Sequence, residues 1–288
     1  MSNKLIYTNI HLASKYRDNY YNTSATNYTY TLPTTLKNVT SLKLSSICIP
    51  NTWYLISHKA NNNRFIIEIE VDNKELSIFE IVIPDGNYND KTLQDYLNNN
   101  YFYNSETMNL LQHVKFEINE NTLKSEFSLL ETCDDSSKMS IKFVDDRTQS
   151  ITGTFGWLIG FRYGQYLNIG DILMSEGLWD GGGDRYLYFC LKDFNKSTNT
   201  SNIVFFDKTE LRSEDILAKI YMLDGKFGLN IDNEPDTVNN HTKTRKYFGP
   251  VDINRIEVKL LDEYGNVIDL NNMDFSFSLE ISQKYNSY

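Results

Sequence analysis

Alanine is scarce in this chain of 288 residues and occurs only four times: Ala13, Ala25, Ala60 and Ala218. Because alanine is the best helix former, its scarcity disfavours a helical bundle and a doubly wound α/β domain. Aromatic residues instead make up 14% of the chain, with 20 Tyr and 16 Phe. These side chains favour strands, so the composition predicts a β-rich protein.

The chain also lacks an excess of positive charge. It has 28 Lys and Arg against 38 Asp and Glu, a formal net charge of −10 and a pI near 4.9. Nucleic acid and anionic membranes attract positive potential, so this balance argues against either as the main partner. No apolar run approaches the roughly 18 residues of a membrane span, and the N-terminus has no secretory signal pattern. We therefore expect no membrane span.

Cysteine and catalytic motifs are equally sparse. Cys48, Cys133 and Cys190 form no CxxC pair, so we interpret them as buried thiols of a protein made in a reducing compartment. The sequence contains no GxxxxGK, GxGxxG, HExxH or GxSxG pattern. Asp180 and Asp184 flank three glycines and could hold carboxylates for metal binding or glycoside hydrolysis. A solvated surface loop is the simpler interpretation, so we predict no catalytic activity, metal or cofactor.

Period-two alternation of apolar residues is the main signal along the chain. In 38–50 the apolar set shifts from even positions, Leu42 and Leu44, to odd positions, Ile47 and Ile49. One extra residue in an alternating strand indicates a bulge. Similar runs predict further strands at 64–71, 76–83, 114–118, 123–130, 138–144, 186–191, 203–206, 216–222, 253–260 and 275–281.

These strands, with no α/β alternation, predict an all-β fold, and their number favours an eight-stranded jelly roll over an immunoglobulin-like sandwich. We predict a single jelly-roll β-sandwich over 28–283, with inserted glycine- and aromatic-rich loops at about 153–183. One short helix should follow Asn89 or Asp90. Residues 1–27 are predicted to be an arm and 284–288 a tail. The predicted core residues are Leu42, Leu44, Ile47, Ile49, Ile256, Val258, Leu260, Phe275, Phe277 and Leu279.

A group of tyrosines near the N-terminus stands apart from this pattern: Tyr16, Tyr20, Tyr21, Tyr28 and Tyr30. They lie among Asn, Asp and Thr without an apolar face of their own. A segment so poor in aliphatic residues cannot bury enough apolar area to order itself. We therefore interpret these tyrosines as candidate contacts with another chain.

Several phrases, spread over residues 40 to 280, resemble those of one protein family in the same order. They are Leu42-Lys-Leu-Ser-Ser-Ile-Cys-Ile-Pro50, Ile83-Pro-Asp-Gly-Asn-Tyr88, Phe155-Gly-Trp-Leu-Ile-Gly-Phe-Arg162, Ile216-Leu-Ala-Lys-Ile220, Tyr247-Phe-Gly-Pro-Val-Asp-Ile-Asn-Arg-Ile-Glu-Val-Lys-Leu-Leu-Asp-Glu-Tyr-Gly265 and Asp274-Phe-Ser-Phe-Ser-Leu279. With these phrases the chain resembles the penton and minor capsid proteins of large icosahedral DNA viruses, the giant-virus and algal-virus group.

The resemblance implies a non-enzymatic jelly-roll protein of the virion capsid, made in the host cytoplasm. It transfers no catalytic residue. It implies a homo-oligomer, a pentamer if the chain is a penton, in contact with the major capsid protein and other minor capsid proteins. Two roles stay open: a penton in a five-fold ring at each vertex, or a minor capsid protein that cements capsomers. A five-fold ring of chains of charge −10 should assemble more strongly as salt screens their repulsion.

The glycines and prolines of these phrases are interpreted as scaffold. Gly86 and Gly265 suit turn positions that need φ > 0, and Pro50, Pro84 and Pro250 mark strand boundaries.

Two other classes compete with the capsid interpretation. The aromatic content and the Asp180–Asp184 loop also fit a carbohydrate-binding or glycosidase-like β-sandwich, whose sugar contacts would depend on Trp179. A cellular β-sandwich adaptor is the second alternative, and no specific feature of the sequence supports it.

Overall fold

The computed structural model describes residues 4–71, 75–102, 110–130, 136–198, 204–206, 211–212, 215–222, 230–233 and 243–285. Its strands are β1 (Leu5–Ala13), β2 (Asn27–Pro50), β3 (Arg64–Glu70), β4 (Ser77–Val82), β5 (Val114–Ile118), β6 (Ser125–Leu129), β7 (Lys138–Lys142), β8 (Gln165–Ile169), β9 (Ile172–Met174), β10 (Tyr186–Lys192), β11 (Val204–Phe205), β12 (Leu211–Arg212), β13 (Ile216–Tyr221), β14 (Asn230–Asn233), β15 (Thr244–Leu261) and β16 (Ser276–Lys284). The helices are α1 (Asp90–Asn100) and α2 (Phe155–Leu158), with 3₁₀ turns η1 (Ser14–Tyr16), η2 (Tyr20–Asn22) and η3 (Leu110–His113).

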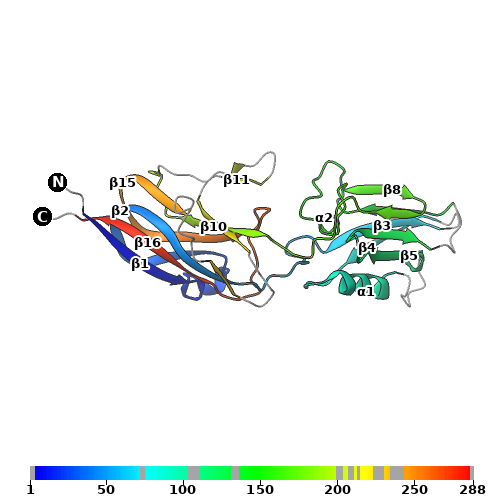
Figure 1. Cartoon of the computed structure of the whole chain (residues 1–288), viewed down its shortest axis with the longest axis horizontal. Coiled ribbons are helices and arrows are strands. Elements are labelled where there is room, and N and C mark those ends of the chain that lie inside the picture. The colour runs from blue at the N-terminus through cyan, green and yellow to red at the C-terminus, as the bar shows by residue number, and fades with distance from the viewer. Residues whose placement is uncertain are drawn as a thin grey trace. The chain divides into compact units, whose positions relative to one another are not determined.

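The chain divides into two compact units (Figure 1). Unit 1 comprises Met1–Trp53 and Asp184–Tyr288, and unit 2 is Tyr54–Gly183, which is inserted between them in the sequence. Strands dominate both units, so the all-β class is confirmed. The division corrects the prediction of one domain over 28–283. The inserted unit is built from short alternating strands like those of unit 1, so periodicity does not mark its boundaries.

Unit 1 is built on one antiparallel sheet with the strand order β1-β16-β2-β15-β10-β13, and β14 also pairs with β2. Residues 27–36 of β2 pair with β15 and not with β16, residues 39–43 pair with both strands, and residues 44–48 pair with β16 and not with β15. Because the long strand changes partners along its length, the sheet curls around a single aliphatic and aromatic core. All ten predicted core residues lie in that core.

The predicted bulge in β2 is present. Ser278 of β16 pairs with Ser46, but the next residue, Leu279, pairs with Leu44, so Ser45 is the extra residue. The apolar residues before and after the bulge are both at most 1% exposed. The bulge thus keeps both phases of the alternation on the core face.

The predicted N-terminal arm is instead part of the sheet of unit 1. β1 pairs with β16 without interruption from Leu5, opposite Lys284, to Ala13, opposite Ser276. Leu12 is only 7% exposed and belongs to the core. The apolar residues in β1 alternate sufficiently to complete the sheet, so residues 4–27 need no other chain to become ordered. Of the predicted tail, Lys284 still belongs to β16, and residues 286–288 lie outside the described part.

Unit 2 contains a sheet in the order β4-β3-β7-β8 and a second in the order β5-β6-β9. β3 and β4, both predicted as strands, form an antiparallel pair, and residues 72–74 between them lie outside the described residues. Its core is rich in phenylalanine: Phe65, Phe102, Phe116, Phe127, Phe143, Phe155 and Phe161. The 153–183 region, predicted as loops, contains α2, β8 and β9. Its many glycines obscured these short elements because they interrupt the alternation.

The helix α1 begins where the sequence predicts. The Asn89 side chain accepts the Thr92 backbone N–H at 2.8 Å, and Thr92 Oγ1 accepts the Asn89 N–H at 2.9 Å. Leu93 and Leu97 are fully buried. The side chain of Asn98 also exchanges two hydrogen bonds with the backbone of Phe116, at 2.8 and 3.0 Å, and so covers the edge of β5.

Two separate cores predict two separable unfolding transitions. Phe277→Ala should lower the stability of unit 1, and Phe127→Ala that of unit 2, each by about 3–5 kcal/mol, because each removes a fully buried ring. Differential scanning calorimetry of the full chain measures both. If both variants shifted one common transition by the same amount, the two cores would be energetically one.

Candidate assembly surface

The segment between β1 and β2, residues 14–26, carries the exposed tyrosines and is called the tyrosine loop. Tyr16 is 67% exposed, Tyr20 is 46% exposed and Tyr21 is 95% exposed. The rings of Tyr20 and Tyr21 meet edge to face at 5.4 Å between centroids. Large aromatic side chains at this exposure are typical anchors of protein interfaces.

Two charged side chains, Arg17 and Asp18, hold the tyrosine loop in place through hydrogen bonds. The Arg17 side chain is 8% exposed, and its Nη1 donates to Asp274 Oδ1 at 3.1 Å and to the Ser14 carbonyl at 3.0 Å. Its guanidinium carbon also lies 4.0 Å from the centroid of the Tyr20 ring. Asp18 Oδ2 accepts the N–H and the hydroxyl of Thr31 at 2.9 and 2.7 Å. The loop is therefore ordered within its own chain.

Two of the five predicted contact tyrosines do not belong to this surface. Tyr28 is 3% exposed, its ring meets Phe275 edge to face at 6.4 Å, and burial raises the pKa of its hydroxyl. Tyr30 is half-buried and packs against the same core. Both lie on β2, whose alternation directs them inward, whereas Tyr16, Tyr20 and Tyr21 lie in the loop before it.

A second exposed aromatic group was not predicted from the sequence. Phe248 is 78% exposed and Phe194 is 44% exposed, and the guanidinium carbon of Arg255 lies 4.1 Å from the Phe194 ring centroid. Tyrosines and phenylalanines are so frequent in this chain that exposure could not be inferred from composition.

Beneath this second group lies a buried ionic cluster. Arg245 Nη1 donates to Asp193 Oδ2 at 3.0 Å, and the Tyr247 hydroxyl donates to the same oxygen. Burial and the Asp193 charge raise the pKa of Tyr247. The phrase that begins at Tyr247 therefore starts with a residue that donates a hydrogen bond to a buried carboxylate, whose charge Arg245 balances.

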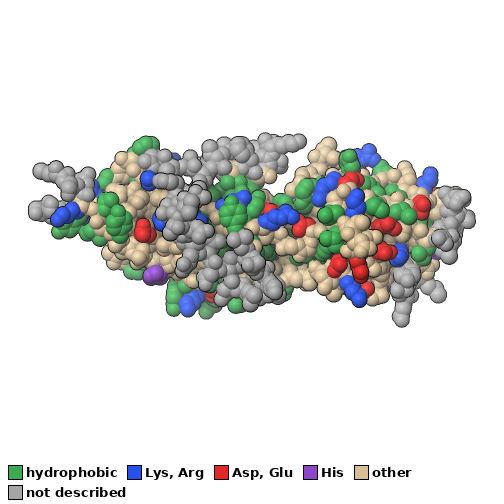
Figure 2. Space-filling model, in the orientation of Figure 1, with side chains coloured by type: hydrophobic (Ala, Val, Ile, Leu, Met, Phe, Trp, Pro, Cys, Tyr) green, Lys and Arg blue, Asp and Glu red, His purple; other side chains and the backbone are tan. Residues whose placement is uncertain are grey.

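The net negative charge of the chain comes entirely from unit 2. Unit 2 contains 20 Asp and Glu against 10 Lys and Arg, which gives the full net charge of −10, whereas unit 1 contains 18 of each and is neutral. Most of the red carboxylate side chains visible in Figure 2 accordingly lie over unit 2. The tyrosine loop thus belongs to the unit that carries no net charge.

Of the predicted scaffold residues, three lie where the sequence suggests. Pro50 ends β2, Pro84 follows β4, and Gly265 has the positive φ that its turn position predicts, at 89°. The prediction of a positive φ at Gly86 is wrong, because Gly86 is not among the glycines with positive φ. Instead, Gly86 exchanges backbone hydrogen bonds with Ile56 at 2.9 and 3.1 Å.

Pro250 is also corrected, because it lies within β15 and not at a strand boundary. Lys246 pairs with Ser41 and Val251 with Val39, so residues 247–250 of β15 stand opposite a single residue of β2. A proline has no N–H to donate, and such a bulge is where a strand tolerates it.

The Pro84–Asn87 turn makes long-range hydrogen bonds that its sequence does not predict. Asp85 Oδ1 accepts the His58 N–H at 2.7 Å, and its Oδ2 lies 2.8 Å from His58 Nδ1. Asn87 Oδ1 accepts the Leu55 N–H at 2.7 Å. The turn therefore fastens the first residues of unit 2 to its body. Burial alone would raise the pKa of the Asp85 carboxyl. The hydrogen bonds from His58 lower it by more, so the pKa of Asp85 lies below its ordinary value.

The predicted carboxylate pair at 180–184 is divided between the units. Asp180 belongs to unit 2, where its N–H donates to the Leu158 carbonyl at 2.9 Å. Asp184 begins the second segment of unit 1, and its Oδ2 accepts the Trp53 indole N–H at 3.0 Å. Burial and the negative charges of Asp262 and Glu263 raise the pKa of Asp184 to about 7. Asp184 thus fastens Trp53 within unit 1.

The structure gives no support for a metal centre in the described part of the chain. No three His, Cys, Asp or Glu side chains there are grouped to hold an ion. Cys48 is half-buried and Cys190 is buried, neither in a disulfide, whereas Cys133 lies outside the described residues. No helix in the same residues has the length and apolar character to cross a membrane.

No protein-family model matches the chain, and no curated protein matches it. Among solved structures, the chain is similar to the penton protein of mavirus, with 10% sequence identity and a TM-score of 0.49. That similarity covers 96% of this chain and 99% of the mavirus protein. No function is assigned from a likeness at this level.

The raised pKa of Asp184 predicts a specific pH dependence. Because this carboxyl has a pKa of about 7 in the folded chain against 3.8 for an ordinary aspartate, folding favours its protonated form. Unit 1 should therefore lose stability as the pH rises from about 4 to about 7. Asp184→Asn cannot ionise, so the variant should be more stable than the wild type at pH 8 and little changed at pH 4.

Thermal unfolding across pH 4–8 measures this effect. Asp180→Asn, which removes the same charge from unit 2, is the matched control and should leave the pH dependence of unit 1 unchanged. An Asp184→Asn variant with the wild-type pH profile would show that this carboxyl does not govern the dependence.

Proposed function

We propose that the chain is a non-enzymatic structural protein of a viral capsid, with unit 1 as a capsid-type jelly roll and the penton as its role. In this proposal the chain resides in the virion and forms a homopentamer that contacts the major capsid protein and other minor capsid proteins. It needs no cofactor and does not bind nucleic acid directly. The observation that carries the proposal is the preformed tyrosine loop on a unit of zero net charge, in a chain whose inserted unit holds the whole net charge.

The family-like phrases support a scaffold shared by shell proteins, because their residues build the two cores. Phe155, Ile159 and Phe161 of the third phrase are all fully buried. A Cβ at Gly156 would approach the Phe143 ring to 2.3 Å, so only glycine fits against that ring. The phrases are thus accounted for by packing, and no catalytic group is needed to explain them.

The distribution of charge supports unit 1 as the part that meets other copies. A ring repeats one head-to-tail contact, and that contact must not bring large like charges together. Unit 1 satisfies this requirement with a net charge of zero, whereas unit 2 does not. In the proposed ring, unit 1 forms the contacts and unit 2 stays exposed to solvent.

The order of the tyrosine loop supports its role in these contacts. Arg17 and Asp18 already fix the loop before any partner binds. A preordered aromatic surface loses less conformational entropy on binding than a flexible arm. The loop therefore replaces the disordered arm as the proposed contact.

Truncation of the exposed rings should weaken assembly. The double variant Tyr16→Ala, Tyr21→Ala removes two exposed side chains without touching the Arg17–Asp274 ion pair, so the monomer should stay folded. We expect at least a tenfold loss of assembly, because interface aromatics are often worth about 2 kcal/mol or more each. Sedimentation of the purified chain and incorporation into particles measure it.

Tyr163→Ala is the matched control, since Tyr163 is 65% exposed but lies on unit 2. Equal assembly by the double variant and the wild type would exclude the tyrosine loop as a contact. A strict monomer that never enters particles would exclude the capsid role.

Salt should strengthen assembly, because the acidic units repel one another. Raising the ionic strength to about 0.15 M shortens the Debye length to about 8 Å and screens this repulsion. The quadruple variant Glu75→Gln, Glu120→Gln, Asp145→Asn, Asp171→Asn removes four exposed charges from unit 2 and should reduce the salt dependence. Light scattering at rising NaCl measures it, and assembly that weakens with salt would contradict this charge distribution.

A further inference from the structure

β1 is an edge strand with one side open. It pairs with β16 over nine consecutive residues without a register shift, and no other strand pairs with it among the described residues. Alternate N–H and C=O groups of such a strand point away from the sheet, toward any further strand.

Within the part of the chain that the structure describes, two other edges are protected but the outer edge of β1 is not. The first half of β2 carries Pro33, and Asp18 caps the N–H of Thr31. Asn98 of α1 covers the edge of β5 in the same way. Between Leu5 and Ala13, in contrast, the sequence has no proline, no lysine or arginine and no carboxylate. These are the devices that keep edges from pairing, and β1 has none of them.

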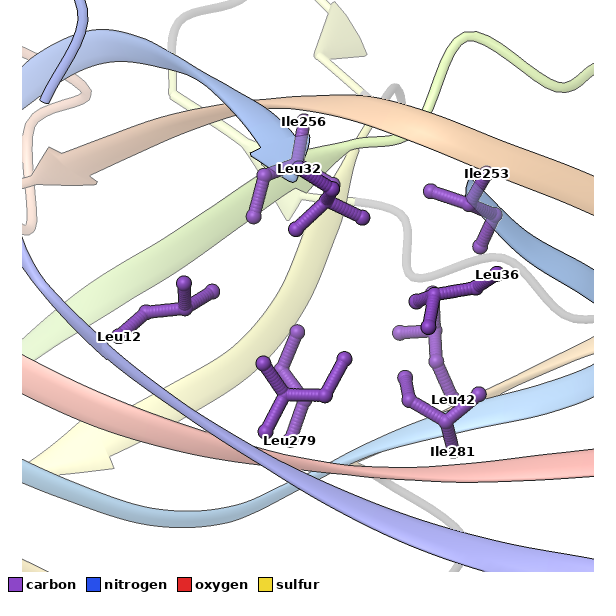
Figure 3. Close-up of a pocket in the computed structure, with 9 residues that line it drawn as sticks. Leu12, Leu32, Leu36, Leu42, Ile253, Ile256, Leu279 and Ile281 are labelled. Atoms are coloured by element: carbon purple, nitrogen blue, oxygen red, sulfur yellow. The ribbon is translucent and has the colours of Figure 1, made fainter. Parts of the chain in front are cut away.

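The exposed side chains of β1 are apolar at its beginning. Leu5 is 44% exposed, Ile6 is 45% exposed and Tyr7 is 64% exposed. Further along the strand, Ile10 and Leu12 line a small pocket whose wall consists only of aliphatic side chains: Ile10, Leu12, Leu32, Leu36, Leu42, Ile253, Ile256, Leu279 and Ile281. Figure 3 shows the labelled side chains of β1, β2, β15 and β16 around this space. A strand added beside β1 would lie next to this apolar pocket.

We propose that β1 pairs in antiparallel fashion with β1 of a second copy of this chain, about a two-fold axis at Asn9. In this register Leu5 of one copy lies opposite Ala13 of the other, and all nine residues pair. Two-fold contacts of this kind use the same surface on both copies.

The strand is complementary to itself in this register. Tyr7 stands opposite His11, so two rings meet on the outer face, and Ile6 stands opposite Leu12 on the inner face. Directly opposed residues of this kind stabilise an antiparallel pair. No like charges oppose each other along the paired strands, because β1 contains no Lys, Arg, Asp or Glu.

The ends of the paired strands bring no like charges directly opposite each other. Lys4 of one copy comes opposite Ser14 of the other, whose hydroxyl donates to Asp274 Oδ1 at 2.7 Å. Asp274 is already paired with Arg17 of its own copy, so this end of the register adds no net attraction. The self-complementary order of apolar and aromatic residues along β1 is what favours a second copy as the occupant of the edge.

The inference does not rest on the proposed capsid role. A two-fold pair differs from the head-to-tail contact of a five-fold ring, so the paired form belongs to the chain before assembly. It would cover an edge that is otherwise open to aggregation.

Cysteine trapping tests both the pairing and its register. Directly opposed residues of an antiparallel pair have Cα atoms about 4.5–5.5 Å apart, within the range of a disulfide. Asn9→Cys should therefore form a disulfide dimer under mild oxidation. Tyr7→Cys alone should not, because its counterpart lies four residues along, about 13 Å away. A mixture of Tyr7→Cys and His11→Cys should give the mixed dimer.

Thr35→Cys, at an exposed position of β2, and the wild type measure the background from other cysteines. Asn9→Lys places two ammonium groups opposite each other and should abolish the concentration-dependent dimer seen by sedimentation, with unchanged thermal stability. The proposal is overturned if Asn9→Cys cross-links no more than Thr35→Cys, or if Tyr7→Cys cross-links as well as Asn9→Cys. Ring assembly by the Tyr16 and Tyr21 variants is measured separately, so failure of the capsid role leaves this test intact.

Discussion

The bend of β2 at Asn38 is the constraint on which unit 1 depends. Val39 pairs with Val251 and Leu36 with Ile253, so two residues of β2 stand opposite Asp252 alone. Asn38 adopts φ of 56°, which asparagine tolerates better than most residues, and its N–H donates to Asp252 Oδ1 at 2.9 Å. Beyond this bend β2 still pairs with β15 as far as Lys43 and also pairs with β16, whose other side pairs with β1. The bend thus lies where β2 gains its second partner strand.

Hydrogen bonds within each unit hold the chain segments that adjoin the insertion of unit 2. Within unit 1, Asp184 accepts the indole N–H of Trp53, so the two ends that flank the insertion are held together. Within unit 2, Asp85 and Asn87 hold the entering segment. An insertion whose ends are adjacent does not stretch its host, so each unit can keep its own core.

Sequence periodicity predicted what depends on local alternation and failed where distant contacts decide. The bulge at Ser45, the helix cap at Asn89 and strands such as β5 all follow from neighbouring residues. Pro250 was misplaced because a bulge inside β15 depends on its partner strand. The division into units was missed because both have the same strand pattern. Tyr28 was grouped with the surface tyrosines because its neighbours are polar. Its place in the alternation of β2 instead directs its side chain into the core.

The candidate surface shows why a contact site of this kind is hidden in a sequence. Arg17 orders the tyrosine loop through Asp274, which is 257 residues away in the chain. Read alone, the loop is a polar segment with no core of its own, and disorder is the natural inference. The ion pair changes that inference, because it orders the backbone while leaving the rings of Tyr16 and Tyr21 in solvent. Exposed rings on a fixed frame lose little freedom when they become buried by a partner, whereas rings on a flexible arm must first be ordered. The same residues thus change from an arm that needs a partner in order to fold into a surface that is folded within its own chain.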